Sequence, residues 1–127
     1  MQKNILFPVL AILAGVLIVI LMGFGNKNEV SIKYVLDNKK DIVLIDVREP
    51  EELQADGYIE GATNIPMNIL PSSLNNVPKD KQVIVYCRSG RRSVVSVNQL
   101  SQLGYTNVKS MTGGIQAWKG AGLPVKY

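Results

Sequence analysis

The residue best suited to chemistry in this chain is its single cysteine, Cys87. It directly follows the apolar run at residues 83–86, and a loop with three arginines and a helix-forming segment come next. Nearby cations and a helix N-terminus lower the pKa of a cysteine, and the thiolate is its nucleophilic form. The position therefore predicts a nucleophile, against the alternative of a small buried apolar side chain.

The six residues after Cys87 supply groups that bind an anion. Gly90 permits a positive φ, which lets the chain curl over the sulfur and point amide N–H groups inward. The following helix adds its positive dipole end. We expect a substrate-binding loop in which some arginines bind carboxylates or solvent instead. Its residues are Arg88, Ser89, Gly90, Arg91, Arg92 and Ser93.

Composition removes several other chemistries. The chain has no histidine, which excludes Ser-His and Cys-His catalysis and any histidine-ligated metal. It has neither a P-loop nor a GxGxxG motif, so nucleotide binding has no support. The net charge of +4 favours small anionic substrates, and the absence of a long basic run argues against nucleic acid.

The pattern around the loop alternates strands with helices. We expect strands at residues 42–45, 62–65, 82–86 and 107–111. We expect helices at 32–38 after Ser31, from Pro50 to Gly57, at 91–103 and at 113–119. A further helix, interrupted by Pro71, is expected within residues 68–75. This order predicts an α/β domain whose mainly parallel sheet carries helices on both faces. Sites in such sheets form at the carboxyl ends of strands.

Two further groups of residues have positions that suggest structural roles. Asp46 and Arg48 follow a predicted strand, and we expect an ion pair that fixes a turn, or alternatively one that supports the cysteine loop. Gly113, Gly114 and Trp118 are interpreted as turn and packing residues.

The N-terminal part has a different composition. Residues 5–24 carry no charge, and about 20 apolar residues span the roughly 30 Å hydrocarbon core of a bilayer. We predict a membrane anchor or signal segment at residues 1–25 and one folded domain at 26–127. Lysines after the run favour a cytoplasm-facing domain, whereas the short basic start also suits an exported one.

Separated motifs resemble the rhodanese family of sulfurtransferases over residues 31–125. They are IDVREPEEL at 45–53, GYIEGATNIP at 57–66, VYCRSGRRS at 85–93, GY at 104–105, GG at 113–114, AW at 117–118 and GLPV at 122–125. The resemblance implies a rhodanese-like fold that needs no cofactor. It also implies that Cys87 accepts sulfane sulfur from thiosulfate or a persulfide donor, and that the Cys87 persulfide passes it to a thiol, cyanide or protein acceptor.

The chain departs from the family at Tyr58, where members usually carry histidine, which puts local packing and substrate access in doubt. Cysteine phosphatases place an arginine where this chain has Ser93, one position beyond Arg92. That shorter spacing favours sulfur over phosphate chemistry. A membrane-tethered sulfur relay or a regulatory binding module with little free-standing activity remains the alternative.

Overall fold

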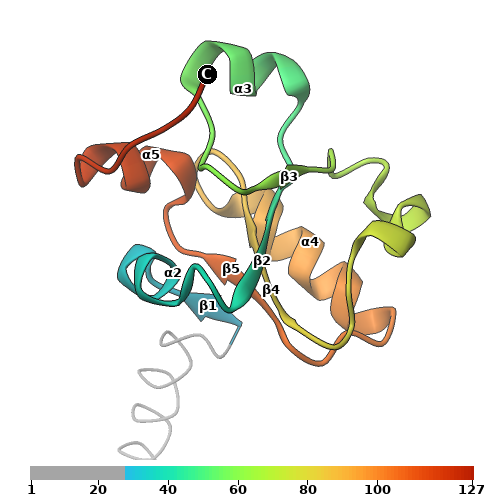
Figure 1. Ribbon diagram of the computed structural model, residues 1–127. Coiled ribbons are helices and arrows are strands. Elements are labelled where there is room, and N and C mark those ends of the chain that lie inside the picture. The colour runs from blue at the N-terminus through green and yellow to red at the C-terminus, as the bar shows by residue number, and fades with distance from the viewer. Residues whose placement is uncertain (1–27) are drawn as a thin grey trace, which may run out of the picture.

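The computed structural model describes residues 28–127, and Figure 1 shows their arrangement. The helices and strands in chain order are β1 (Glu29–Val30), α2 (Ile32–Asn38), β2 (Ile42–Asp46), α3 (Pro50–Asp56), β3 (Thr63–Asn64), β4 (Gln82–Tyr86), α4 (Arg91–Gln102), β5 (Val108–Met111) and α5 (Gly114–Gly120). Two 3-10 turns, Leu70–Ser72 and Leu74–Asn76, lie between β3 and β4.

The five strands within these residues form one parallel sheet in the order β1-β5-β4-β2-β3. β4 lies at the centre and pairs along its whole length with β2, from Ile42 opposite Gln82 to Asp46 opposite Tyr86. The carboxyl ends of β2 and β4 therefore lie side by side. This arrangement confirms the predicted fold class and brings the segment after Asp46 next to Cys87.

The two faces of the sheet are covered by different helices (Figure 1). Val83 and Val85 of β4 belong to a buried cluster with Leu100 of α4. The alternate residue Ile84 belongs to a second buried cluster with Trp118 of α5. A strand that is apolar at every position suits this double burial, because successive side chains point to opposite faces.

Local signals place two of the helices where they were expected. Ser31 caps α2 by accepting a hydrogen bond from the Tyr34 amide at 3.0 Å. α3 begins at Pro50 behind a capping box made by Glu49 and Glu52. It ends at Gly57, whose φ of 80° is costly for a residue with a side chain.

Two segments differ from the sequence-based expectation. β1 was not predicted: its two residues pair with β5 at the sheet edge, and so short a strand depends on its partner rather than on its own pattern. The interrupted helix expected within residues 68–75 is a pair of 3-10 turns. Pro71 has no amide hydrogen for an α-helical bond, which favours short turns.

The predicted membrane anchor or signal segment, residues 1–25, lies outside the described residues. Among residues 28–127, no helix combines the length and the apolar character needed to cross a bilayer. The folded domain begins, as far as the structure describes it, with the polar residue Asn28 and the edge strand β1.

Candidate functional site

Cys87 follows the last residue of β4, and only 1% of its surface is exposed. The Gly90 amide donates a hydrogen bond to Sγ at 3.1 Å, and the thiol donates to Ser93 Oγ at 3.5 Å. Gly90 precedes α4 with a φ of 108°, the positive value expected from the sequence. The loop thus curls over the sulfur and encloses it between the end of β4 and the first turn of α4.

The surroundings of the sulfur favour its ionised form. Burial raises the pKa of the Cys87 thiol, because it disfavours the charged state. Hydrogen bonds from the Ser93 hydroxyl and from the amides of Ser93, Gly90 and Ser89 act in the opposite direction and outweigh burial. The net effect holds the pKa of Cys87 below its ordinary value, as nucleophilic chemistry requires.

The start of α5 holds the other side of the cysteine loop. The Ile115 amide donates to the Cys87 carbonyl at 2.9 Å, and the Gln116 amide donates to the Arg88 carbonyl at 3.1 Å. Gly114 has a φ of 61°, and a Cβ there would overlap both carbonyl oxygens. Gly114 is therefore more than the turn residue predicted from the sequence. The signal for this contact was the Gly-Gly pair before a helix.

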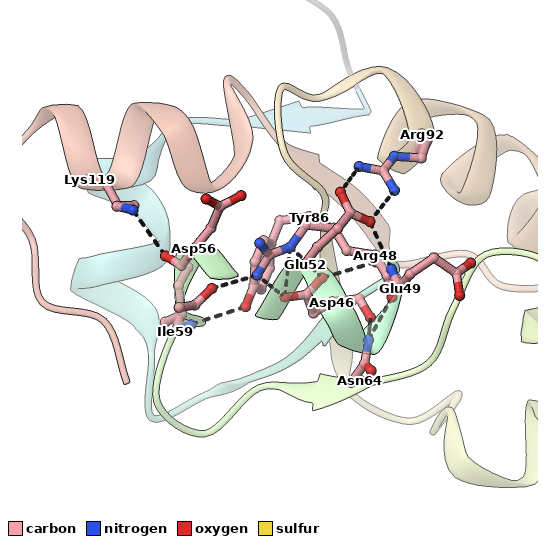
Figure 2. Close-up of polar contacts among 11 residues, drawn as sticks. Asp46, Arg48, Glu49, Glu52, Asp56, Ile59, Asn64, Tyr86, Arg92 and Lys119 are labelled. Atoms are coloured by element: carbon pink, nitrogen blue, oxygen red, sulfur yellow. Dashed lines mark hydrogen bonds and ion pairs between the residues drawn. The ribbon is translucent and has the colours of Figure 1, made fainter. Parts of the chain in front are cut away.

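The three arginines of the loop have different partners. Arg92 makes a bidentate ion pair with Glu52 of α3, with both N–O distances at 2.7 Å (Figure 2). Hydrogen bonding from Arg92 lowers the pKa of Glu52 to about 2 despite partial burial. The pair also raises the pKa of Arg92 and joins α3 to the first turn of α4. Arg92 is therefore one of the arginines that binds a carboxylate.

Arg88 and Arg91 are exposed, and the described residues supply no hydrogen-bond or ion-pair partner for either side chain. Arg88 lines a cavity of about 350 Å³ that it shares with Lys119. Arg91 lines another cavity, of about 430 Å³, together with Glu29 and Ser110. The structure thus leaves two cations of the loop available to anions, one at each cavity.

Asp46 and Arg48 form a fully buried ion pair at the end of β2 (Figure 2). Arg48 Nη2 lies 2.7 Å from Asp46 Oδ2 and also donates to the Gly57 carbonyl at 2.8 Å. Burial opposes the charge of Arg48, but Asp46 outweighs it and raises the pKa of the guanidinium. Asn64 donates to the backbone carbonyls of both residues, which fixes the turn after β2.

Tyr86 joins this cluster to the cysteine loop. Arg48 lies 5.8 Å from the centre of the Tyr86 ring, and the Ile59 amide donates to the Tyr86 hydroxyl at 3.1 Å. Burial and the charge of Asp46 raise the pKa of the Tyr86 phenol, which keeps it neutral. Because Tyr86 immediately precedes Cys87, the buried cluster fixes the strand end from which the loop departs.

Tyr58, the departure from the family pattern, lies in a backbone bridge with the C-terminal segment. Its amide donates to the Lys126 carbonyl at 2.8 Å, and the Lys126 amide donates to the Tyr58 carbonyl at 2.8 Å. These bonds involve the main chain, which any residue type except proline supplies. They hold the C-terminal segment against the chain that follows α3.

Comparisons with known proteins point to one family. A model of the rhodanese-like domain matches residues 31–121. A sulfurtransferase of Allochromatium vinosum is 41% identical over 75% of this chain and 88% of its own length. The chloroplastic thiosulfate sulfurtransferase 16 of Arabidopsis thaliana is 37% identical over 65% of this chain and 78% of its own length.

A solved structure gives the same result. The rhodanese-related protein of Thermoplasma volcanium has a TM-score of 0.73 and 37% sequence identity, over 78% of this chain and 97% of that protein. The chain belongs to the rhodanese-like domain family, and its relatives include proteins named as sulfurtransferases.

Proposed function

We propose that the protein is a sulfurtransferase that carries sulfane sulfur on Cys87. The observation that carries the proposal is the hydrogen-bonded setting of Sγ, in which amide and hydroxyl donors lower the pKa of a nearly buried thiol. In the first half-reaction, the Cys87 thiolate attacks the outer sulfur of thiosulfate or of a persulfide donor. The donor S–S bond breaks with its electron pair, so sulfite or a thiolate leaves and Cys87 becomes a persulfide.

The second half-reaction returns the enzyme to its starting state. An acceptor thiolate, cyanide or a cysteine of a protein partner attacks the outer sulfur of the persulfide, and the S–S bond to Cys87 breaks. The amides that face Sγ also suit the negative terminal sulfur of the intermediate. The unpaired side chains of Arg88 and Arg91 attract a small anionic donor to the loop.

A steady-state assay tests this proposal with the full chain in mild detergent. The enzyme is given thiosulfate and cyanide over a matrix of concentrations, and thiocyanate is followed with time. We expect double-displacement kinetics, with parallel lines in double-reciprocal plots, and no turnover by Cys87→Ser. Folded protein that forms no thiocyanate from thiosulfate or from a small persulfide donor would contradict free-standing sulfurtransferase activity.

A second candidate function is a membrane-tethered sulfur relay whose acceptor is another protein. The observation that favours it is the uncharged apolar run at residues 5–24, long enough for a membrane anchor. Tethering raises the effective concentration of the domain near membrane partners. Fractionation of cells that express the full chain tests the anchor, because we expect the chain in membranes after a carbonate wash. Protease protection then reports which side the domain faces, with the cytoplasmic side expected.

A further inference from the structure

A second hydroxyl lies behind the one that contacts the sulfur. Ser110 of β5 is 1% exposed, and its Oγ lies 2.7 Å from Oγ of Ser93. Ser93 Oγ in turn lies 3.5 Å from Cys87 Sγ and 3.1 Å from the Gly90 carbonyl, to which it donates. Three side chains from the end of β4, from α4 and from β5 therefore form one continuous series of polar contacts.

The hydroxyl of Ser110 matters because the Ser93 hydroxyl has only one proton to donate. A serine hydroxyl has one proton to donate and two lone pairs that accept. While Cys87 is a thiol, it donates to Ser93, and Ser93 donates to the Gly90 carbonyl. When Cys87 is a thiolate, Ser93 stabilises it only by turning its own proton toward Sγ. The Gly90 carbonyl keeps a partner in that state, because the Val94 amide also donates to it.

We propose that Ser110 is a positioning residue that directs the Ser93 proton to the sulfur. Its hydroxyl donates to Ser93 Oγ, and Ser93 then donates to the thiolate. The inference rests on the proposed function only in taking Cys87 as the nucleophile. Ser110 does not touch the sulfur and acts through Ser93.

The hydroxyls of Ser93 and Ser110 also give the buried Cys87 thiol a route for its proton. Ser110 lines the cavity of about 430 Å³, and Glu29 lines it from the neighbouring strand position, where β1 pairs with β5. When the Ser93 hydroxyl turns from the Gly90 carbonyl to Ser110, the Cys87 proton passes to Ser93 as Ser93 passes its own to Ser110, and Ser110 releases its proton to solvent in the cavity. The electron pair of the S–H bond stays on sulfur. Both hydroxyls end neutral and oriented toward the thiolate.

Several charged groups lie around the side chains of Cys87, Ser93 and Ser110. Glu29 of β1 and Arg91 of α4 line the cavity, while Arg92 of α4 is bound to Glu52 of α3. The ion pair between Asp46 and Arg48 lies at the end of β2. A substitution at Ser110 changes none of these charges. A change in the titration of Cys87 in such a variant therefore reports the hydroxyl.

A matched pair of variants tests the proposal in the full chain. Ser110→Thr keeps the hydroxyl, whereas Ser110→Val has nearly the same shape and lacks it. Alkylation of Cys87 by iodoacetamide is followed by intact mass over a range of pH. We expect the profile of Ser110→Val to move to higher pH, with alkylation about tenfold slower at pH values below the midpoint. Ser110→Thr should stay close to the unmodified protein.

The remaining outcomes are also decisive. Equal profiles for the Val and Thr variants would overturn the proposal, whether both match the unmodified chain or both are shifted. Thermal unfolding checks that the variants fold. If the larger side chains disturb the strand, Ser110→Ala takes the place of Ser110→Val and must show the same shift. Alkylation needs no sulfur transfer, so a chain that shows the Ser110 effect without transferring sulfur would contradict the proposed function alone.

Discussion

Two polar regions lie side by side at the carboxyl ends of β4 and β2, and they satisfy their charges differently. The buried ion pair at the end of β2 is enclosed by partners from the same domain: Arg48 binds Asp46 and the Gly57 carbonyl. The loop after β4 instead directs donors at one ionisable sulfur and leaves Arg88 and Arg91 unpaired among the described residues. Charge alone therefore does not mark the reactive region. Donors that converge on an ionisable atom, with free cations beside it, do.

We expect the greatest loss of stability from a substitution in the buried ion pair of Asp46 and Arg48. Arg48→Met leaves the buried carboxylate of Asp46 without its partner, and breaking a buried pair this way costs about 3–5 kcal/mol of unfolding free energy. Denaturant unfolding measures the loss. Lys33→Met, which breaks the exposed pair with Asp37, is the control and should leave the stability nearly unchanged, because solvent screens exposed pairs. An Arg48→Met variant with full stability and no sulfur transfer would make the pair part of the reactive site.

The next effect tests how the cysteine loop is held. Gly114→Ala places a Cβ on the carbonyl oxygens of Cys87 and Arg88, so the loop must shift. Misplacement of a reacting group by about 1 Å costs about a hundredfold in rate, and we expect a loss of that order in kcat/KM for thiosulfate. Gly120→Ala is the matched control, since a Cβ at Gly120 meets no atom within 4 Å. Equal activity of the two variants would show that the contact with α5 does not position the loop.

A smaller effect concerns the bridge between α3 and α4. The pKa of Glu52 falls from 4.5 to about 2 in the folded protein, so its pair with Arg92 stabilises the fold above about pH 4.5 and loses that effect as the pH falls toward 2. Because both side chains are partly exposed, we expect Glu52→Gln to cost only about 1 kcal/mol at neutral pH. Unfolding at several pH values should show the difference vanish in acid. Glu60→Gln, at an exposed carboxylate 3.9 Å from Lys126, is the control and should lower the stability less at neutral pH.

The smallest effect sharpens the role of the unpaired arginines. Arg88→Gln and Arg91→Gln each remove one exposed cation near the sulfur, so we expect KM for thiosulfate to rise about two- to fivefold with kcat nearly unchanged. The rise should shrink at high ionic strength, because salt screens exposed charges. Steady-state kinetics at two salt concentrations measures both effects. A fall in kcat without a change in KM would instead place the arginine in the chemical step.

The sequence was sufficient for those features that depend on neighbouring residues. The apolar strand before Cys87, the glycine that curls the loop and the helix that follows it are local patterns, and the order of strands and helices predicted a parallel sheet. The buried pair of Asp46 and Arg48, two residues apart, was likewise anticipated as an ion pair that fixes a turn. The structure bears out each of these expectations.

Features that join distant segments were not predictable in the same way. Three contacts depend on how the sheet brings remote residues together. They are the hydroxyl contact between Ser93 and Ser110, the hydrogen bond from α5 to the Cys87 carbonyl, and the pairing of β1 with β5. Arg92 and Arg91 are adjacent in sequence, yet only one meets a carboxylate, because Glu52 lies on the side that Arg92 faces. A loop sequence alone carries no information about such partners.

We propose that Cys87 carries sulfur while the polar cluster beside it serves the fold. The most direct test is the intact mass of the full chain after incubation with thiosulfate and removal of the excess. We predict a gain of one sulfur atom, its loss after cyanide is added, no gain in Cys87→Ser, and the same gain in any folded Asp46→Asn protein. A folded wild-type chain that gains no sulfur, or a Cys87→Ser variant that gains it, would contradict the role of Cys87 as the sulfur carrier.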